Sequence, residues 1–321
     1  MVHNTQNSLT SSINKTQILN NTSRLVAKNL KKSYANVEAI AGINLDISAP
    51  GVFAILGQNG AGKTSLIKCA LGLEKISSGL LHTMGHKPGA LKAKQKTGVI
   101  LQDSDLPESL TVKEHIQLFA SYYPMPFSVN QTIEMCDLGS FAHKRYKKLS
   151  GGQKRRAQFA LAVVGDPQLI FLDEPTTGLD IEARRNLWSV IREFANKGKT
   201  IVLTTHYLEE ADNLADRIMV MNAGKIVADA TPKDIHKEVS GSIVRCHTNL
   251  SPDILQKLAG VSGVVISGRY SELRTTLANQ TLVALLSLDP TLSDLSVSQP
   301  KLEDIFGELT GNSATEKGEI K

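Results

Sequence analysis

A glycine-rich stretch between residues 57 and 64 constrains the fold of this chain more than any other feature. It reads Gly57-Gln58-Asn59-Gly60-Ala61-Gly62-Lys63-Thr64, which has the G-x-x-x-x-G-K-S/T spacing of a phosphate-binding P-loop. A short apolar run at 52–56 precedes it and predicts a buried strand, and residues 65–71 predict a helix. Glycines let backbone N–H groups approach phosphate oxygens, and the helix N-terminus adds partial positive charge. We therefore expect Lys63 to reach the outer phosphates of a nucleotide and Thr64 to bind Mg²⁺.

The alternative for this stretch is an ordinary glycine-rich turn beside an unrelated lysine. By composition, the four fixed positions should coincide by chance on the order of 0.01 times in a chain of this size. The remaining motifs decide between the two interpretations.

Two carboxylates end a continuous apolar run later in the chain. Residues 169–172 predict a buried strand, and Asp173 and Glu174 follow it directly. Asp173 suits a Mg²⁺ ligand, direct or through water, and Glu174 suits the polarisation of an attacking water. The alternative is a solvated strand end before the turn at Pro175, and we prefer the functional interpretation.

Polar side chains also end two other predicted strands. Gln102 follows the short strand at 98–101, and His206 follows the buried strand at 200–205. Ligands of α/β proteins bind at the carboxyl ends of such strands. A γ-phosphate contact by His206 is therefore expected, although a lone histidine is more often structural and a lone glutamine means little.

A second glycine-containing segment, Leu149-Ser150-Gly151-Gly152-Gln153, precedes a helical pattern. Small polar residues at a helix N-terminus can bind an anion, but they can equally form a simple N-cap. Taken alone, the segment favours the N-cap. Asp180, before the next amphipathic helix, is expected from its position to be the N-cap of that helix.

Tyr34 lies between two runs with alternating polarity, 25–30 and 43–47, which predict half-exposed antiparallel strands. Its ring could stack on a purine, or it could pack on the edge of the sheet. Position alone does not separate the two.

The composition excludes several classes of protein. The net charge of +5 comes from short, scattered basic clusters without interleaved aromatics, so nucleic-acid binding is not expected. Three widely spaced cysteines fit neither a disulfide framework nor a metal site and indicate a reducing compartment. No apolar run approaches the ~20 residues of a membrane-spanning helix. Residues 1–23 lack the apolar core of a signal peptide and read as a disordered tail.

Together these motifs resemble an ATP-binding cassette (ABC) transporter ATPase over about residues 25–235. The P-loop matches Walker A, Gln102 the Q-loop, and residues 149–153 the family signature. Residues 169–174 match Walker B, 177–180 the D-loop, and His206 the switch histidine. Tyr34 falls where the family keeps an adenine-stacking aromatic. Ile181 departs from the proline that many members have after the D-loop aspartate, which leaves Asp180 in place.

The resemblance implies ATP and Mg²⁺ as ligands and a head-to-tail dimer, expected to be a homodimer. The signature of one subunit then meets the γ-phosphate held by Lys63 of the other. The nucleotide contacts implied are those of Tyr34, Gly57, Gln58, Asn59, Gly60, Ala61, Gly62, Lys63, Thr64, Ser65, Ser150, Gly151, Gly152, Gln153 and Asp180. The implied metal ligands are Thr64, Gln102 and Asp173, and the implied catalytic residues are Glu174, His206 and Gln102.

The implied partner is a separate membrane permease, with this subunit peripheral on the cytoplasmic face of the cell membrane. The Leu302-Glu303-Asp304-Ile305-Phe306 ending is similar to that of the drug-exporter-like branch, which favours export. A soluble ABC protein acting on ribosomes or nucleic acid is the alternative, and such proteins resemble two fused cassettes or carry a long coiled coil. An ordinary P-loop kinase or GTPase is a third possibility, which Ser150 and His206 argue against.

The predicted fold is an α/β P-loop NTPase of the ABC type. It has an N-terminal antiparallel β subdomain, a helical subdomain inserted at about 103–165, and a small C-terminal α+β domain. The expected boundaries are 1–23 for the tail, 24–240 for the ATPase domain, 241–311 for the accessory domain and 312–321 for a frayed end. Short apolar runs at 242–246, 264–267 and 282–286, a helix at 251–259 and an amphipathic helix at 301–310 define the accessory domain.

Overall fold

The computed structural model describes residues 23–102, 105–238 and 241–298. Its contacts divide the chain into two compact units, the first ending at Asp229 and the second beginning at Ala230. The division falls before helix α8, Pro232–Glu238, whereas the expected domain boundary is at 240/241. The expected tails at both ends and the amphipathic segment at 301–310 lie outside the described residues, apart from Ser23.

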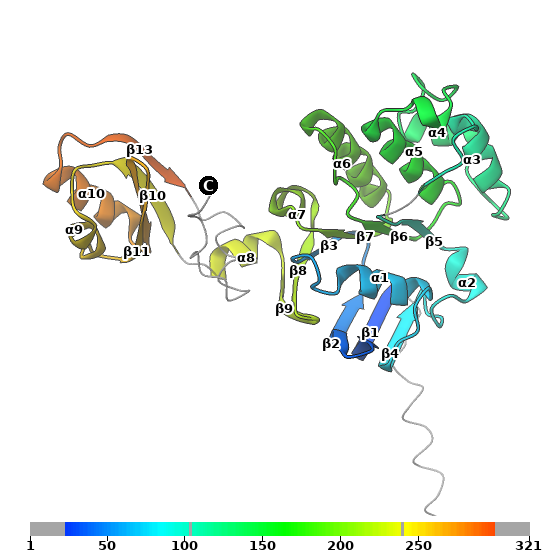
Figure 1. Cartoon of the computed structure of the whole chain (residues 1–321), viewed down its shortest axis with the longest axis horizontal. Helices are drawn as coiled ribbons and strands as arrows, with labels where there is room; N and C mark the ends of the chain where they lie inside the picture. Colours follow the sequence, from blue (N-terminus) through cyan, green and yellow to red (C-terminus); the bar gives the residue numbers. More distant parts are fainter. Residues whose placement is uncertain (1–22, 103–104, 239–240, 299–321) are drawn as a thin grey trace, which may run out of the picture. The chain divides into compact units, whose positions relative to one another are not determined.

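A six-stranded sheet forms the centre of the first unit, with the strand order β5-β6-β7-β3-β8-β9 (Figure 1). The strands from β5 to β8 in this order pair in parallel, as expected of an α/β fold. Strands β3, β6 and β7 are buried along their whole length, which is why their sequences are nearly continuous apolar runs. The bounds are β3 Gly51–Leu56, β5 Thr97–Ile100, β6 Leu169–Asp173, β7 Thr200–Thr205, β8 Arg217–Asn222 and β9 Lys225–Ala230.

A three-stranded antiparallel sheet is ordered β2-β1-β4 (Figure 1). Its strands are β1 Leu25–Tyr34, β2 Val37–Ile47 and β4 Ser78–Thr83. Helix α1, Lys63–Leu71, contacts both this sheet and strand β6 of the central sheet. One hydrophobic cluster joins the buried faces of both sheets to α1, with Ile40 and Ile67 fully buried in it. The expected N-terminal antiparallel subdomain is confirmed, with strands longer than the alternating runs predicted.

The inserted helices are α3 Val112–Ala120, α4 Val129–Met135 and α5 Gly151–Val163, and they pack against one another. Thr111 and Glu114 form the capping box that the sequence predicted for α3. A short helix α2, Leu91–Lys94, precedes β5, and a single 3₁₀ turn at Tyr146–Lys148 leads towards α5. Helices α6, Ile181–Asn196, and α7, Leu208–Leu214, complete the unit.

After α8, the described part of the second unit is a four-stranded antiparallel sheet, ordered β11-β12-β10-β13, with two further helices. Its elements are β10 Ser242–His247, α9 Pro252–Gln256, β11 Val261–Ser267, β12 Tyr270–Thr275, α10 Ala278–Leu288 and β13 Ser293–Ser298. This is the split β-α-β order of ferredoxin-like domains. The apolar run at 282–286 lies in helix α10. The sequence left its structure open, because a short apolar run does not by itself distinguish a strand from a helix.

None of the helices in the described ranges is long and apolar enough to cross a membrane.

Candidate nucleotide site

The P-loop connects β3 to α1, as its spacing predicts. Gly62 precedes α1 with a φ of 104°, and a Cβ there would lie 2.2 Å from the carbonyl oxygen of Ala39. A Cβ at Gly57 would lie 2.5 Å from the carbonyl oxygen of Met221. Both positions therefore require glycine. No side chain caps the N-terminus of α1, so its first N–H groups, including those of Thr64 and Ser65, are oriented to bind an anion.

Lys63 is buried at the base of this loop. Its ammonium group donates hydrogen bonds to the carbonyl oxygens of Gly57, at 2.7 Å, and Gln58, at 3.2 Å. It also lies 3.6 Å from Oε1 of Glu174. Burial lowers the pKa of Lys63, and the Glu174 carboxylate partly opposes that effect.

The carboxylate of Glu174 is the point at which the strand ends meet. Nδ1 of His206, after β7, lies 3.3 Å from Oε1 of Glu174. The side-chain amide of Gln102, after β5, donates to Oε2 at 3.4 Å, and the Thr177 hydroxyl donates to the same oxygen at 3.3 Å. Three segments that are far apart in sequence, together with the nearby Thr177, therefore surround one carboxylate.

Asp173 lies beside the start of α1. Its Oδ1 accepts hydrogen bonds from the hydroxyls of Thr64, at 3.2 Å, and Thr204, at 2.5 Å. Its Oδ2 is buried and has no hydrogen-bond partner among the described residues. The hydroxyl of Thr64 and the unpaired carboxylate oxygen of Asp173 are oxygen ligands that suit Mg²⁺. This ion takes few protein ligands beside phosphate and water. The described residues hold no cluster of three or more acidic, histidine or cysteine side chains that could bind a metal without such help.

The signature segment forms the N-terminus of α5. Ser150 is the N-cap, and its side chain and that of Gln153 each bond the other's backbone amide in a capping box. The N-cap interpretation is thus confirmed. A Cβ at Gly151 would meet nothing within 4 Å, whereas one at Gly152 would lie 2.6 Å from Cβ of Ala183. The space beside Gly151 is therefore open, and anion binding there stays a prediction.

Asp180 caps α6, because its Oδ1 accepts a hydrogen bond from the amide of Ala183 at 2.7 Å. Tyr34 is the last residue of β1 and is 38% exposed, so its ring is not packed into the core. The ammonium of Lys32 lies 4.3 Å from the ring centroid. The stacking of an adenine on this ring stays a prediction.

Two residues of the site were not predicted from the sequence. Thr204, which bonds Asp173, is a threonine inside a fully buried strand. Arg155 is a buried cation on α5, and burial lowers its pKa. The signal for Arg155 was available, because it lies on the same helix face as the buried Phe159.

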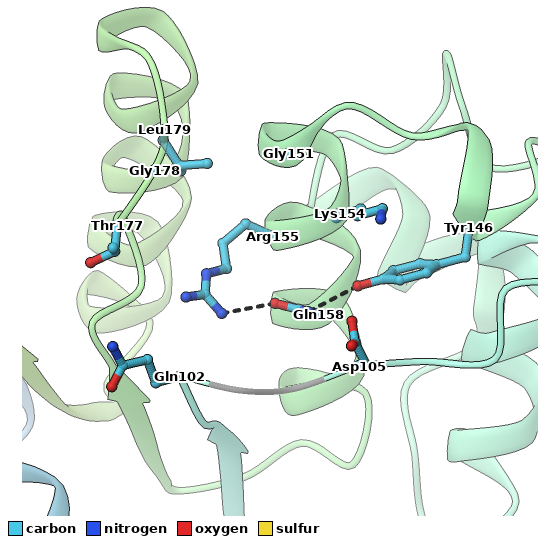
Figure 2. Close-up of a pocket in the computed structure, with 10 residues that line it drawn as sticks. All are labelled: Gln102, Asp105, Tyr146, Gly151, Lys154, Arg155, Gln158, Thr177, Gly178 and Leu179. Carbon is cyan, nitrogen blue, oxygen red and sulfur yellow. Dashed lines mark hydrogen bonds between the residues drawn. The ribbon is translucent and has the colours of Figure 1, made fainter.

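A polar cavity of about 350 Å³ lies between the Gln102 strand end, α5 and the loop before α6 (Figure 2). It is lined by Gln102, Asp105, Tyr146, Gly151, Lys154, Arg155, Gln158, Thr177, Gly178 and Leu179.

Comparison with known proteins identifies the family. A model described as ABC transporter matches residues 40–177, and an AAA domain model matches 145–212. Nod factor export ATP-binding protein I of Rhizobium etli is 32% identical over 299 residues, covering 88% of this chain and 92% of that protein. This chain belongs to the ABC transporter ATP-binding protein family. The ABC ATPase is also 30% identical to daunorubicin resistance ATP-binding protein DrrA3 of Streptomyces coeruleorubidus, over 88% of this chain and 94% of that one.

Solved structures of ABC cassettes share its fold. CbiO1 of Clostridium perfringens, part of the ABC transporter complex cbiONQ, has a TM-score of 0.62 and 28% identity, covering 68% of this chain and 92% of that one. The cassette MJ0796, dimeric in a post-hydrolysis state with ADP and Pi, has a TM-score of 0.59 and 25% identity, covering 65% and 98%. The predicted family, its α/β fold and its ATP-hydrolysing activity are confirmed, and the kinase and GTPase alternatives are excluded.

Proposed function

We propose that this ABC ATPase energises an exporter by binding and hydrolysing ATP at the Walker A site and driving a separate membrane permease. The observation that carries the proposal is the shared Glu174 carboxylate, 3.6 Å from the Lys63 ammonium and 3.3 Å from Nδ1 of His206. One reacting centre is then served by Glu174 as the base, Lys63 as the phosphate-binding cation and His206 as a second phosphate contact.

Each residue of this cluster has a distinct chemical role. Lys63 and the N–H groups that follow it bind the β- and γ-phosphates, so the ammonium exchanges its carbonyl partners for stronger charged ones. Glu174 orients and polarises the attacking water. His206 holds the γ-phosphate, and Gln102 links the Glu174 carboxylate to the inserted helices through the chain that follows β5.

Thr64 and Asp173 would hold Mg²⁺, with Gln102 as a further ligand. Oδ2 of Asp173, which has no hydrogen-bond partner among the described residues, and the adjacent Thr64 hydroxyl support this assignment. A bound Mg²⁺ supplies charge neutralisation for the transferred phosphoryl group.

The active form is a head-to-tail dimer of two copies, in which Ser150, Gly151, Gly152 and Gln153 of one subunit meet the phosphates held by Lys63 of the other. The open space beside Gly151, at the first position of α5, supports this arrangement. Because one polyanion joins two half-sites, ATP stabilises the dimer and its hydrolysis weakens it.

Export, rather than import, is supported by the names of the relatives, which belong to Nod factor export and daunorubicin resistance. The subunit would bind its permease peripherally at the cytoplasmic face of the membrane. We also propose the domain boundaries expected from the sequence, with the ATPase domain at 24–240 and the accessory domain at 241–311.

Purification of the tagged full chain from detergent-solubilised membranes tests this function. We expect an integral membrane protein to co-purify and to raise ATP turnover above that of the chain alone. Recovery with ribosomes, without any membrane subunit, would favour the soluble alternative and contradict the proposal.

A further inference from the structure

Arg155 makes an unusual set of hydrogen bonds from the second turn of α5. Its Nε donates to the carbonyl oxygen of Pro175 at 2.8 Å, and its Nη2 donates to that of Glu174 at 3.0 Å. Its Nη1 donates to Oε1 of Gln158 at 3.0 Å and to the carbonyl oxygen of Leu101 at 3.5 Å. Figure 2 shows the guanidinium reaching from α5 towards the loop before α6, with Gln102 nearby. An arginine that is only 9% exposed thus satisfies its donors on three backbone oxygens and one side-chain oxygen.

The backbone oxygens belong to two strand ends that carry site residues. Leu101 directly precedes Gln102, and Glu174 and Pro175 directly follow the end of β6. The helix that supplies Arg155 begins at Gly151, within the signature. One guanidinium therefore connects the signature helix to the segments that present both Gln102 and Glu174.

The backbone of Glu174 needs such support. Its φ is 48°, a left-handed conformation that is unfavourable for a residue with a side chain and persists only where its surroundings hold it. Its amide donates to the carbonyl and hydroxyl oxygens of Thr204, each at 3.1 Å. Its carbonyl oxygen accepts from Arg155 and, at 3.4 Å, from the amide of Thr177. The first of these contacts comes from β7, and the arginine contact comes from the inserted helices.

We propose that Arg155 is a positioning residue for hydrolysis, which holds the Glu174 backbone in its left-handed conformation and ties that conformation to the placement of the signature helix. The inference rests on the proposed function, because it assumes that Glu174 polarises water. When the signature of α5 binds the phosphates of the partner subunit, movement of α5 is transmitted to Glu174 through this side chain. ATP binding at the P-loop does not require Arg155.

The geometry requires arginine rather than any cation. The donors Nε, Nη1 and Nη2 point in fixed directions within one plane and reach three backbone carbonyls on two strand ends. A lysine would keep the charge but place its donors on one nitrogen. Arg155→Lys therefore separates the effect of charge from the effect of geometry.

The test compares steady-state ATPase kinetics and ATP affinity in full-length Arg155→Lys and Arg155→Gln. We expect kcat to fall on the order of 10- to 100-fold, as misplacement of a catalytic group does, with little change in the Kd for ATP. In the Glu174→Gln background, Arg155→Lys should lower the residual turnover by much less than it does in the wild type, because the group it positions is already lost. A purely structural role would lower turnover by the same factor in both backgrounds.

Arg156→Gln is the matched control. It removes a guanidinium from the neighbouring position of α5, where Nη1 pairs with Asp137 at 2.7 Å within the inserted helices. Thermal unfolding checks that each variant is folded, and Arg155→Lys decides the question if Arg155→Gln does not fold. Wild-type kcat in Arg155→Lys, or a loss of ATP affinity equal to the loss of kcat, would overturn the inference about Arg155 but leave the proposed function intact. Wild-type turnover by Glu174→Gln would overturn the proposed function, and the inference with it.

Discussion

The Lys63 ammonium and the Glu174 carboxylate lie 3.6 Å apart, and both side chains are more than nine-tenths buried. The pair joins the P-loop to the end of β6, across 111 positions of sequence. Because the carboxylate neutralises part of the positive potential that attracts phosphate, the two residues affect nucleotide binding in opposite ways, although hydrolysis needs both.

Replacing Glu174 with glutamine should greatly reduce turnover without weakening ATP binding. The amide cannot accept a proton from water, so we expect kcat to fall on the order of 10²-fold or more. The Kd for ATP should stay the same or decrease, since a negative charge beside Lys63 is removed. Phosphate release and equilibrium ATP binding measure the two effects, and light scattering with ATP should detect a trapped dimer. Glu193→Gln, which alters an exposed ion pair with Lys197, is the control. Unchanged turnover in Glu174→Gln would contradict its assigned role.

Replacing Lys63 with alanine should weaken nucleotide binding. The ammonium group would make charge-assisted hydrogen bonds to phosphate, and losing them should cost about 10- to 100-fold in affinity. Titration of the folded variant with ATP tests this, with Lys68→Ala in the last turn of α1 as the control. Wild-type affinity would argue against the P-loop interpretation.

Replacing Gly151 with alanine should impair the dimer while leaving the monomer stable. A Cβ at this position has no neighbour within 4 Å, and alanine is the better helix former. We therefore expect an unchanged or higher melting temperature, together with loss of ATP-dependent dimerisation. Gly152→Ala is the contrasting variant, since its Cβ would lie 2.6 Å from Cβ of Ala183 and should lower the melting temperature. Normal dimerisation of Gly151→Ala would exclude this surface as the second half-site.

The second unit should lose stability in acid through Asp289. Hydrogen bonds from the hydroxyls of Thr248 and Thr291 lower its pKa from 3.8 to about 2. A carboxyl whose folded pKa is depressed stabilises the fold above its unfolded pKa, and this contribution is lost as the pH falls from about 4 to about 2. Pepsin cleavage within residues 241–298 should rise over this interval in the wild type. Asp289→Asn should be more susceptible at pH 4 and change less below it, whereas Asp253→Asn should follow the wild type.

The sequence could predict where the candidate site residues lie on strand ends, loops and helix caps because each position follows a local pattern. A P-loop needs glycine at fixed positions, and Ser150 and Asp180 are helix N-caps that a few neighbouring residues define. Glu174 and His206 could be placed at strand ends because buried parallel strands are continuous apolar runs. The apolar run at 282–286, which lies within α10, shows the limit of this reasoning, since the run carried no clear period.

The sequence by itself determined the chemistry available, namely a phosphate loop, two carboxylates, a histidine and a second glycine segment. Tertiary structure decided how they combine. The order β5-β6-β7-β3 brings the residues after these strands to one edge, where Glu174 meets Lys63 and His206. It also brings Arg155 to the Glu174 carbonyl. These contacts depend on strand order and on a left-handed backbone angle, which are set by packing across the whole domain and leave no local pattern in the sequence.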